Sequence, residues 1–221
     1  MYWLLNSSIG RKLTMSISGL FLIMFLLFHM SMNLVLLFSE EAYNMICELL
    51  GANWYAVAAT LVLVAGIVVH IILATFLTLQ NQRSRGSSQY LTSSRTKTEW
   101  SSKNMYILGF VIILGLLLHL WNFWYKMQFA ELTGIHTGHF SPHDGAAYVK
   151  DLFSCPVYAA VYLIWLAALW LHLTHGVWSA FQTAGFNSKT WFPRLQTAGY
   201  IIATIIVAGF AAVPVRYLFF Q

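Results

Sequence analysis

The sequence predicts an all-α integral membrane protein, a bundle of five transmembrane helices that forms a single domain over residues 1–221. Hydrophobic residues make up 59% of the chain and charged residues only 9%, whereas a soluble domain carries about 25% charged residues. Five apolar stretches are longer than the roughly 18 residues that a helix needs to cross a bilayer. Only helices and closed barrels satisfy their backbone in lipid, and runs of this length indicate helices.

The expected spans are 13–38, 54–79, 104–126, 157–182 and 197–219. The first span follows Arg11 and Lys12 and is too long for the apolar core of a cleaved signal peptide, so we expect it to stay in the protein. The fifth span has no histidine. We expect it to close the bundle, with Pro214 bending its outer end.

Basic residues are distributed unequally between the two sides of these spans. If the N-terminus lies inside, nine basic residues flank the spans on the inner side and three on the outer side. This bias places the N-terminus in the cytoplasm and explains the net charge of +5 without a nucleic-acid partner. The inner residues are Arg11, Lys12, Arg83, Arg85, Arg95, Lys97, Lys103, Lys189 and Arg194, and the outer ones are Lys126, Lys150 and Arg216.

Five of the eight histidines lie inside predicted spans: His29, His70, His119, His172 and His175. An ionisable residue within a membrane span indicates a functional site, although a histidine can also simply hydrogen-bond to a neighbouring helix. Five of them on four helices favour the functional interpretation.

Depth sorts four of these histidines into two layers. At 1.5 Å per residue, His29 lies about 15 Å and His119 about 10 Å from the outer ends of their helices. His70 and His172 both lie about 24 Å down, and His175 about 29 Å down. The first and third helices therefore supply an outer layer, and the second and fourth supply an inner one.

Two facing imidazoles in a dry bundle suit a six-coordinate b-type haem, whose iron takes one nitrogen from each face. A zinc site would need three or four ligands at one depth, and these helices carry no carboxylate. There is no C-x-x-C-H motif for covalent attachment. Two such haems, one above the other, predict a path for electrons across the membrane.

With these residues in view, the chain resembles the di-haem cytochrome b subunit of succinate dehydrogenase and fumarate reductase. The resemblance rests on RKLTMSISGL before His29, on His70 in GIVVHIILATFLTLQNQRSR and on His119 in ILGLLLHLWNFW. The fourth helix adds an H-x-x-x-G pattern that runs from His172 to Gly176 and continues as Val177-Trp178.

The resemblance implies a membrane anchor in the bacterial inner membrane, with a flavoprotein and an iron–sulfur subunit bound on its cytoplasmic face. Electrons would pass between the iron–sulfur subunit, an inner haem b, an outer haem b and a quinone, expected to be menaquinone. Succinate or fumarate chemistry would belong to the flavoprotein. Some members of this family carry a glutamate two residues before the fourth-helix ligand, where this chain has Trp170.

Within this resemblance, His29 and His119 are the expected axial ligands of the outer haem, and His70 and His172 those of the inner haem. His175, one turn below His172, is expected to neighbour the inner haem or to replace His172 as its ligand. Candidates for the quinone site are Glu40, Glu41 and Glu48, which follow the outer end of the first helix, and Trp121 and Asn122, which lie just above His119 in the third.

Other polar features have two interpretations. Arg11, Lys12 and Ser16 can contact haem propionates or mark the membrane interface. The basic loop 80–103 determines topology, and the resemblance adds contact with the iron–sulfur subunit. Cys47 and Cys155 on the outer side can pair or remain thiols. The outer loop has a candidate metal site in His136, His139, His143 and Asp144, for which a hydrated loop beside the quinone is the alternative.

Two other functions stay open. Another di-haem membrane cytochrome, such as the anchor of a nitrate reductase, hydrogenase or formate dehydrogenase, shares the histidine pairs but places them on different helices. A histidine-lined metal or proton transporter would need no haem.

Overall fold

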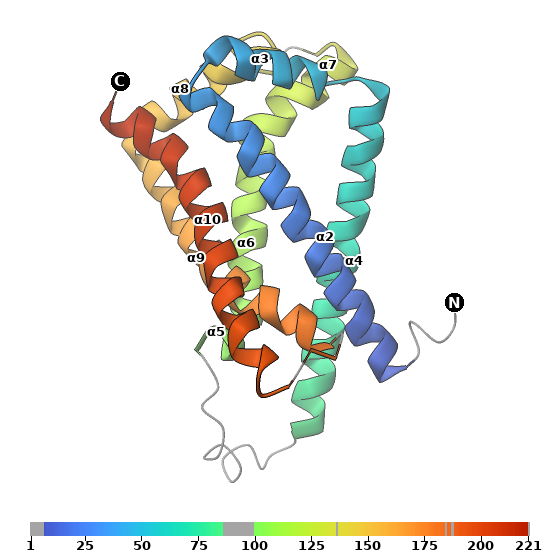
Figure 1. The fold of residues 1–221 in the computed structure, drawn as a ribbon. Helices are drawn as coiled ribbons and strands as arrows, with labels where there is room; N and C mark the ends of the chain where they lie inside the picture. Colours follow the sequence, from blue (N-terminus) through green and yellow to red (C-terminus); the bar gives the residue numbers. More distant parts are fainter. Residues whose placement is uncertain (1–6, 86–99, 136, 184, 187, 221) are drawn as a thin grey trace.

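The computed structural model describes residues 7–85, 100–135, 137–183, 185–186 and 188–220, and the regular structure within these ranges is helical (Figure 1). Predictions for His136 and for the central part of the loop 80–103 fall outside these ranges. The elements are α2 (Ser8–Leu34), η1 (Val35–Leu37), α3 (Glu40–Leu49), α4 (Trp54–Arg85), α5 (Trp100–Lys103), α6 (Met105–His119), η2 (Leu120–Phe129), α7 (Ala130–Thr133), α8 (Gly145–Ser154), α9 (Pro156–Thr183) and α10 (Trp191–Phe219).

Five helices in the described part of the chain are long and apolar enough to cross a membrane, which confirms the predicted five-helix class and a multi-pass membrane protein. They are longer than predicted at several ends. The first starts at Ser8 because the Ser7 side chain accepts a hydrogen bond from the Gly10 amide and caps the helix. The third continues from α6 through the π-helical segment η2 into α7.

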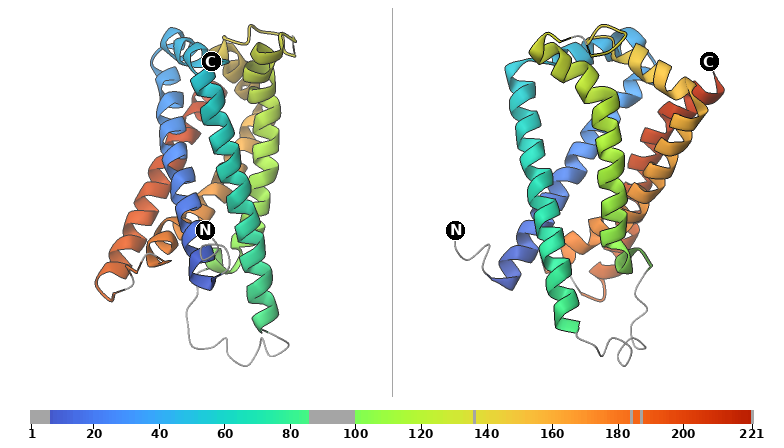
Figure 2. Two further views of the ribbon diagram at one scale, coloured as in Figure 1. Left: turned by 90° about the vertical axis from the view of Figure 1, so that its right-hand side faces the viewer. Right: turned by 180° about the vertical axis from the view of Figure 1, so that it is seen from behind.

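Four of the spans enclose a common interior. Helix α2 packs against α4 on one side and α9 on the other, and α6 packs against α9 and touches α4 lightly. This order makes α2 and α6 one diagonal of the bundle and α4 and α9 the other (Figure 2). Side chains on diagonal helices can meet only in the interior of the bundle.

Helix α10 lies outside this four-helix arrangement and packs along α9 and α2. Ala203 and Ile206 of α10 are fully buried against Leu166, Leu169 and Leu173 of α9. The Trp170 indole donates a hydrogen bond to the Thr204 hydroxyl at 3.0 Å, which adds a polar link between the two helices. The expectation that the fifth span closes the bundle is therefore met by packing against α9 and α2.

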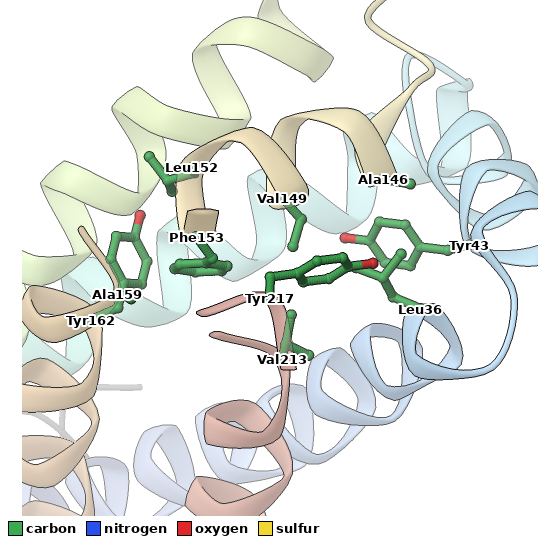
Figure 3. Packing of buried hydrophobic residues seen from close by; sticks show 10 residues of the cluster. All are labelled: Leu36, Tyr43, Ala146, Val149, Leu152, Phe153, Ala159, Tyr162, Val213 and Tyr217. Atoms are coloured by element: carbon green, nitrogen blue, oxygen red, sulfur yellow. The ribbon is translucent and has the colours of Figure 1, made fainter. Parts of the chain in front are cut away.

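Three short helices, α3, α7 and α8, cover one end of the bundle, called the cap end here (Figure 1). A hydrophobic cluster joins α8 to the ends of the spans below it (Figure 3). A polar link holds α3 to α8: the Asn44 amide donates to the Asp144 carboxylate at 2.9 Å and accepts from the Ala146 amide at 2.9 Å. The cluster consists of Leu36, Tyr43, Ala146, Val149, Leu152, Phe153, Ala159, Tyr162, Val213 and Tyr217.

Both cysteines lie at the cap end, and both are free thiols. Cys47 packs against Gly145, where an added Cβ would overlap its sulfur. The pKa of the Cys47 thiol is raised to about 11, mainly by burial and in part by the nearby Asp144 carboxylate. Cys47 is therefore a packed, weakly reactive thiol.

We expect Cys47 to react slowly with iodoacetamide at neutral pH, because the thiolate is the reactive form and its fraction is small far below the pKa. In a Cys155→Ser variant, whose only cysteine is Cys47, the alkylation rate should rise about tenfold per pH unit between pH 7 and pH 10. Mass spectrometry of timed samples measures the rate. A rate that levels off near pH 8.5, as for an ordinary thiol, would contradict the buried environment.

Candidate functional site

The first histidine pair lies on the diagonal between α2 and α6. The ring centroids of His29 and His119 are 5.8 Å apart, and their planes are nearly perpendicular at 84°. His29 is in the middle of the first span, and His119 is the last residue of α6 before the π-helical segment begins. The depth argument predicted that these two residues face each other, and the geometry brings them together.

Aromatic rings surround this pair. Phe25 stacks on His29 at 5.4 Å from the same helix, and Phe210 approaches the His29 ring from α10 at 5.5 Å. Phe123 and Trp165 approach His119 at 5.2 and 5.9 Å. The two imidazoles therefore lie in an apolar, aromatic enclosure that excludes water.

Trp165 takes its position from the third span. Its indole donates to the Ile112 carbonyl at 3.1 Å, and its ring occupies the space that a side chain at Gly115 would fill. A larger residue at Gly115 would push the indole, which contacts His119. Gly115 thus lets α9 approach α6 closely beside the first pair.

The second pair lies on the other diagonal, with His70 on α4 and His172 on α9. His172 is within electrostatic range of His70. The His70 ring lies against Gly19 of α2, and its Nδ1 is 3.2 Å from the Ser18 hydroxyl. His172 lies beside Gly109 of α6, and its buried Nδ1 has no hydrogen-bond partner within the described chain.

Gly176, the glycine of the H-x-x-x-G pattern, does not receive the His172 ring: among the described residues no atom lies within 4 Å of a Cβ added there. The close approach is made instead by Gly109 on the facing helix. His175 packs edge-on against the Trp178 ring, with centroids 4.7 Å apart, and is also within electrostatic range of His172. Whether His172 or His175 is a ligand stays a prediction.

Buried donors lie near the end of the bundle opposite the cap. The Arg11 guanidinium lies over the Phe76 ring at 4.8 Å, and its buried Nε has no hydrogen-bond partner in the described part of the protein. The same is true of the Trp178 indole nitrogen. Of the other two propionate candidates, Ser16 donates to the Lys12 carbonyl at 3.0 Å, and Lys12 is exposed. Arg11 is thus the candidate that offers an unsatisfied buried N–H group.

The three glutamates nominated for the quinone site lie on the exposed surface of α3. Glu40 is 4.0 Å from the Lys150 ammonium group, and both side chains are more than half exposed. Glu41 and Glu48 line a hollow in the cap surface together with His143 and Asp144. These carboxylates are therefore accessible to the aqueous phase above the bundle.

Trp121 and Asn122 have opposite environments. Trp121 is 61% exposed and stacks on Tyr125 with centroids 4.9 Å apart, so it faces away from the bundle. Asn122 is only 5% exposed and donates to the Tyr162 hydroxyl at 3.2 Å. The Tyr162 ring is 6.4 Å from the His119 ring. The Asn122–Tyr162 link is therefore a buried polar group close to the first pair, and Tyr162 was missed in the sequence.

A second buried polar group that the sequence did not indicate is Gln128, at the end of η2. Its amide donates to the Gly51 carbonyl at 2.8 Å and accepts from the Trp124 indole at 2.7 Å. Thr60 also donates to it at 3.2 Å. Gln128 therefore joins the third span to the start of the second, which explains why a buried amide is tolerated there.

The cap end gives no support to the metal site considered in the outer loop. His143 is 3.9 Å from the Glu131 carboxylate. Among the described residues, no three histidine, cysteine or acidic side chains form a group able to hold a metal ion. The interior of the bundle instead brings histidines together in pairs.

The interior residues fit a metal held between two imidazoles. Two imidazoles on opposite sides of one ion would have centroids roughly 6 Å apart, given metal–nitrogen bonds of about 2 Å. The 5.8 Å separation of His29 and His119 agrees with this. Their perpendicular planes are compatible as well, because each plane has only to contain its own metal–nitrogen bond. The aromatic walls around this first pair suit a porphyrin. The Arg11 and Trp178 donors, toward the end of the bundle opposite the cap, suit the carboxylates of a second porphyrin beside the other pair.

No protein-family model, curated protein or solved structure matches the chain.

Proposed function

We propose that this protein is the di-haem cytochrome b subunit of a succinate dehydrogenase or fumarate reductase complex. In this role it anchors a flavoprotein and an iron–sulfur subunit to the membrane and passes electrons between the iron–sulfur subunit and a quinone, menaquinone being the expected one. The reaction on succinate or fumarate takes place on the flavoprotein, so this chain is the electron-transfer and quinone-reactive part of the enzyme.

The observation that carries the proposal is the placement of four histidines on the two diagonals of one bundle. His29 and His119 meet across α2 and α6, and His70 and His172 approach across α4 and α9. Diagonal helices do not pack directly against each other, so a group held between such side chains lies in the interior of the bundle. The same four residues carry the resemblance drawn from the sequence.

The chemistry follows from the ligands. A haem iron bound by two imidazoles has no open coordination position and supplies reversible one-electron transfer. His29 and His119 would hold one haem, and His70 and His172 the other. Phe25, with the other rings around the first pair, would exclude water from it. The chain itself moves no substrate atoms at these positions.

The two ends of the bundle would have different partners. The N-terminus of α2 and the loop after α4 are basic, and the positive-inside bias assigns that end to the cytoplasm, where the iron–sulfur subunit would bind. The cap end would then face the opposite aqueous phase and the quinone. There the Asn122–Tyr162 link is a buried polar group close to His119, and Glu41 and Glu48 are acids open to water.

The decisive experiment is purification of the chain from membranes of its own host, with haem and copurifying subunits measured together. We expect two b-type haems per chain by the pyridine haemochrome assay, together with a covalent flavin and succinate-linked or fumarate-linked quinone activity. Two haems without the flavin would identify the anchor of a different respiratory enzyme. A haem-free protein would refute the proposal.

Substitution of single histidines should separate the two haems. His29→Ala and His119→Ala should each abolish the same low-spin spectral component, because the loss of either ligand opens the same site. His70→Ala should abolish the other component. Loss of one component by both His29→Ala and His70→Ala would show that the pairing across the diagonals is wrong. His139→Ala, in the cap loop, is the control that should keep both.

The choice between His172 and His175 can be made in the same way. We expect His172→Ala to lose the component that His70→Ala loses, because His172 approaches His70 across the bundle. His175→Ala should keep that component, with at most a shifted midpoint potential, since a neighbouring group tunes the metal without binding it. Haem content and redox titration provide the measurements. The reverse result would make His175 the ligand.

A further inference from the structure

Ser18 makes two polar contacts in the interior of the bundle. Its hydroxyl is 2.9 Å from the Met15 backbone carbonyl of the same helix and 3.2 Å from Nδ1 of His70 on α4. The side chain is buried, with Ser18 only 7% exposed. The serine side of both contacts is therefore shielded from water.

Only one assignment of protons satisfies both contacts. A hydroxyl has one proton to donate, and a carbonyl can only accept. The contact with Met15 therefore uses the Ser18 proton, which leaves a lone pair of the serine oxygen facing Nδ1. For that contact to be a hydrogen bond, Nδ1 of His70 must carry a proton. In a neutral imidazole the other nitrogen, Nε2, then has the free lone pair.

The position of the ring agrees with this assignment. The His70 ring lies against Gly19, where its Cε1 would be 3.5 Å from an added Cβ. Ser18 and Gly19 are adjacent, so one short segment of α2 both contacts the ring and accepts the hydrogen bond from its Nδ1–H group. The ring thereby has one preferred orientation and one preferred tautomer.

We infer that Ser18 is a positioning residue that holds His70 in the Nδ1-protonated tautomer and leaves Nε2 free to bind a metal in the interior of the bundle. The binding of a metal by Nε2 rests on the proposed function, whereas the tautomer of His70 does not depend on it. His172, whose Nδ1 has no such partner within the described chain, has a backbone hydrogen bond to Met105 instead. The two histidines of the second pair are therefore held by different kinds of partner.

This role has a measurable consequence for the metal. An imidazole that donates its second N–H to an acceptor is a more basic ligand, which favours the oxidised metal. Removing the acceptor should favour reduction. Loss of a hydrogen-bond partner of a metal-bound imidazole changes metal affinity or activity by about 10- to 100-fold. For a neutral hydroxyl we expect the lower limit.

The chain provides a matched control in Ser16. This serine is also buried, 8% exposed, and its hydroxyl donates its only proton to the Lys12 carbonyl, so it has none left for a haem propionate. It lies two residues before Ser18 on the same helix, and therefore about 200° around its axis. Ser16→Ala thus removes a buried backbone-bonded hydroxyl from α2 without removing a contact to a histidine.

The experiment is a redox titration of the complete complex carrying Ser18→Ala, Ser18→Thr or Ser16→Ala, observing the component that His70→Ala abolishes. In Ser18→Ala we expect the reduced-to-oxidised ratio at a fixed potential to rise about tenfold. Ser18→Thr, which keeps the hydroxyl, and Ser16→Ala should titrate as the wild type. An unchanged titration in Ser18→Ala, or an equal shift in Ser16→Ala, would overturn the inference.

A second measurement separates this inference from the proposed function. Nitrogen-15 NMR of the full-length protein labelled at histidine reports which ring nitrogen of His70 is protonated, with or without haem; the signal is assigned through its loss in His70→Ala. We expect the Nδ1-protonated form in the wild type and a mixture in Ser18→Ala. If the protein holds no haem, the proposed function fails while this tautomer is still measured. An Nε2-protonated His70 in the haem-free wild type would refute the inference alone.

Discussion

Each imidazole in a membrane-spanning bundle must find a partner for its nitrogens within the protein, because hydrocarbon offers none. The arrangement of the four spans α2, α4, α6 and α9 is understandable from this requirement. His29 and His119 lie on one diagonal pair of helices and His70 and His172 on the other, so each pair can meet only across the interior, and none of these spans carries a carboxylate in its middle. A charged partner is therefore absent from the core, which leaves hydroxyls, carbonyls or a bound metal to satisfy the rings.

Small residues determine how closely the helices approach these rings. Gly19 receives His70, Gly109 receives His172, and Gly115 receives the indole of Trp165, which in turn contacts His119. Each of these glycines lies on a different helix from the ring that it contacts. In a membrane the helices gain little from burying apolar surface against one another, so close approach at small residues is a main source of their stability. The same contacts position the histidines.

The sequence predicted the spans and the sorting of histidines by depth, because both depend on hydrophobic length and a constant rise per residue. Details around the first pair were not predictable in this way. From Leu120 onward the third span is π-helical, so side-chain directions depart from the α-helical period. Trp121 faces outward and Asn122 inward, although both had been placed together, because consecutive residues of a helix point about 100° apart. Ser18 and Gly109 were missed because a contact between helices has no signature in either helix alone.

The two histidine pairs have different surroundings, which in the proposed function would set their relative potentials. His29 and His119 are surrounded by aromatic rings, with the neutral Asn122–Tyr162 link close to His119. Ser18, which contacts His70, lies seven residues after Arg11 on α2, about 10 Å along the helix. In the proposed function, the Arg11 cation would favour an added electron at the second site. The Ser18 contact would act in the opposite sense, because it would strengthen a ligand of the oxidised metal. The midpoint potential of that site would then reflect a balance between this cation and this hydroxyl.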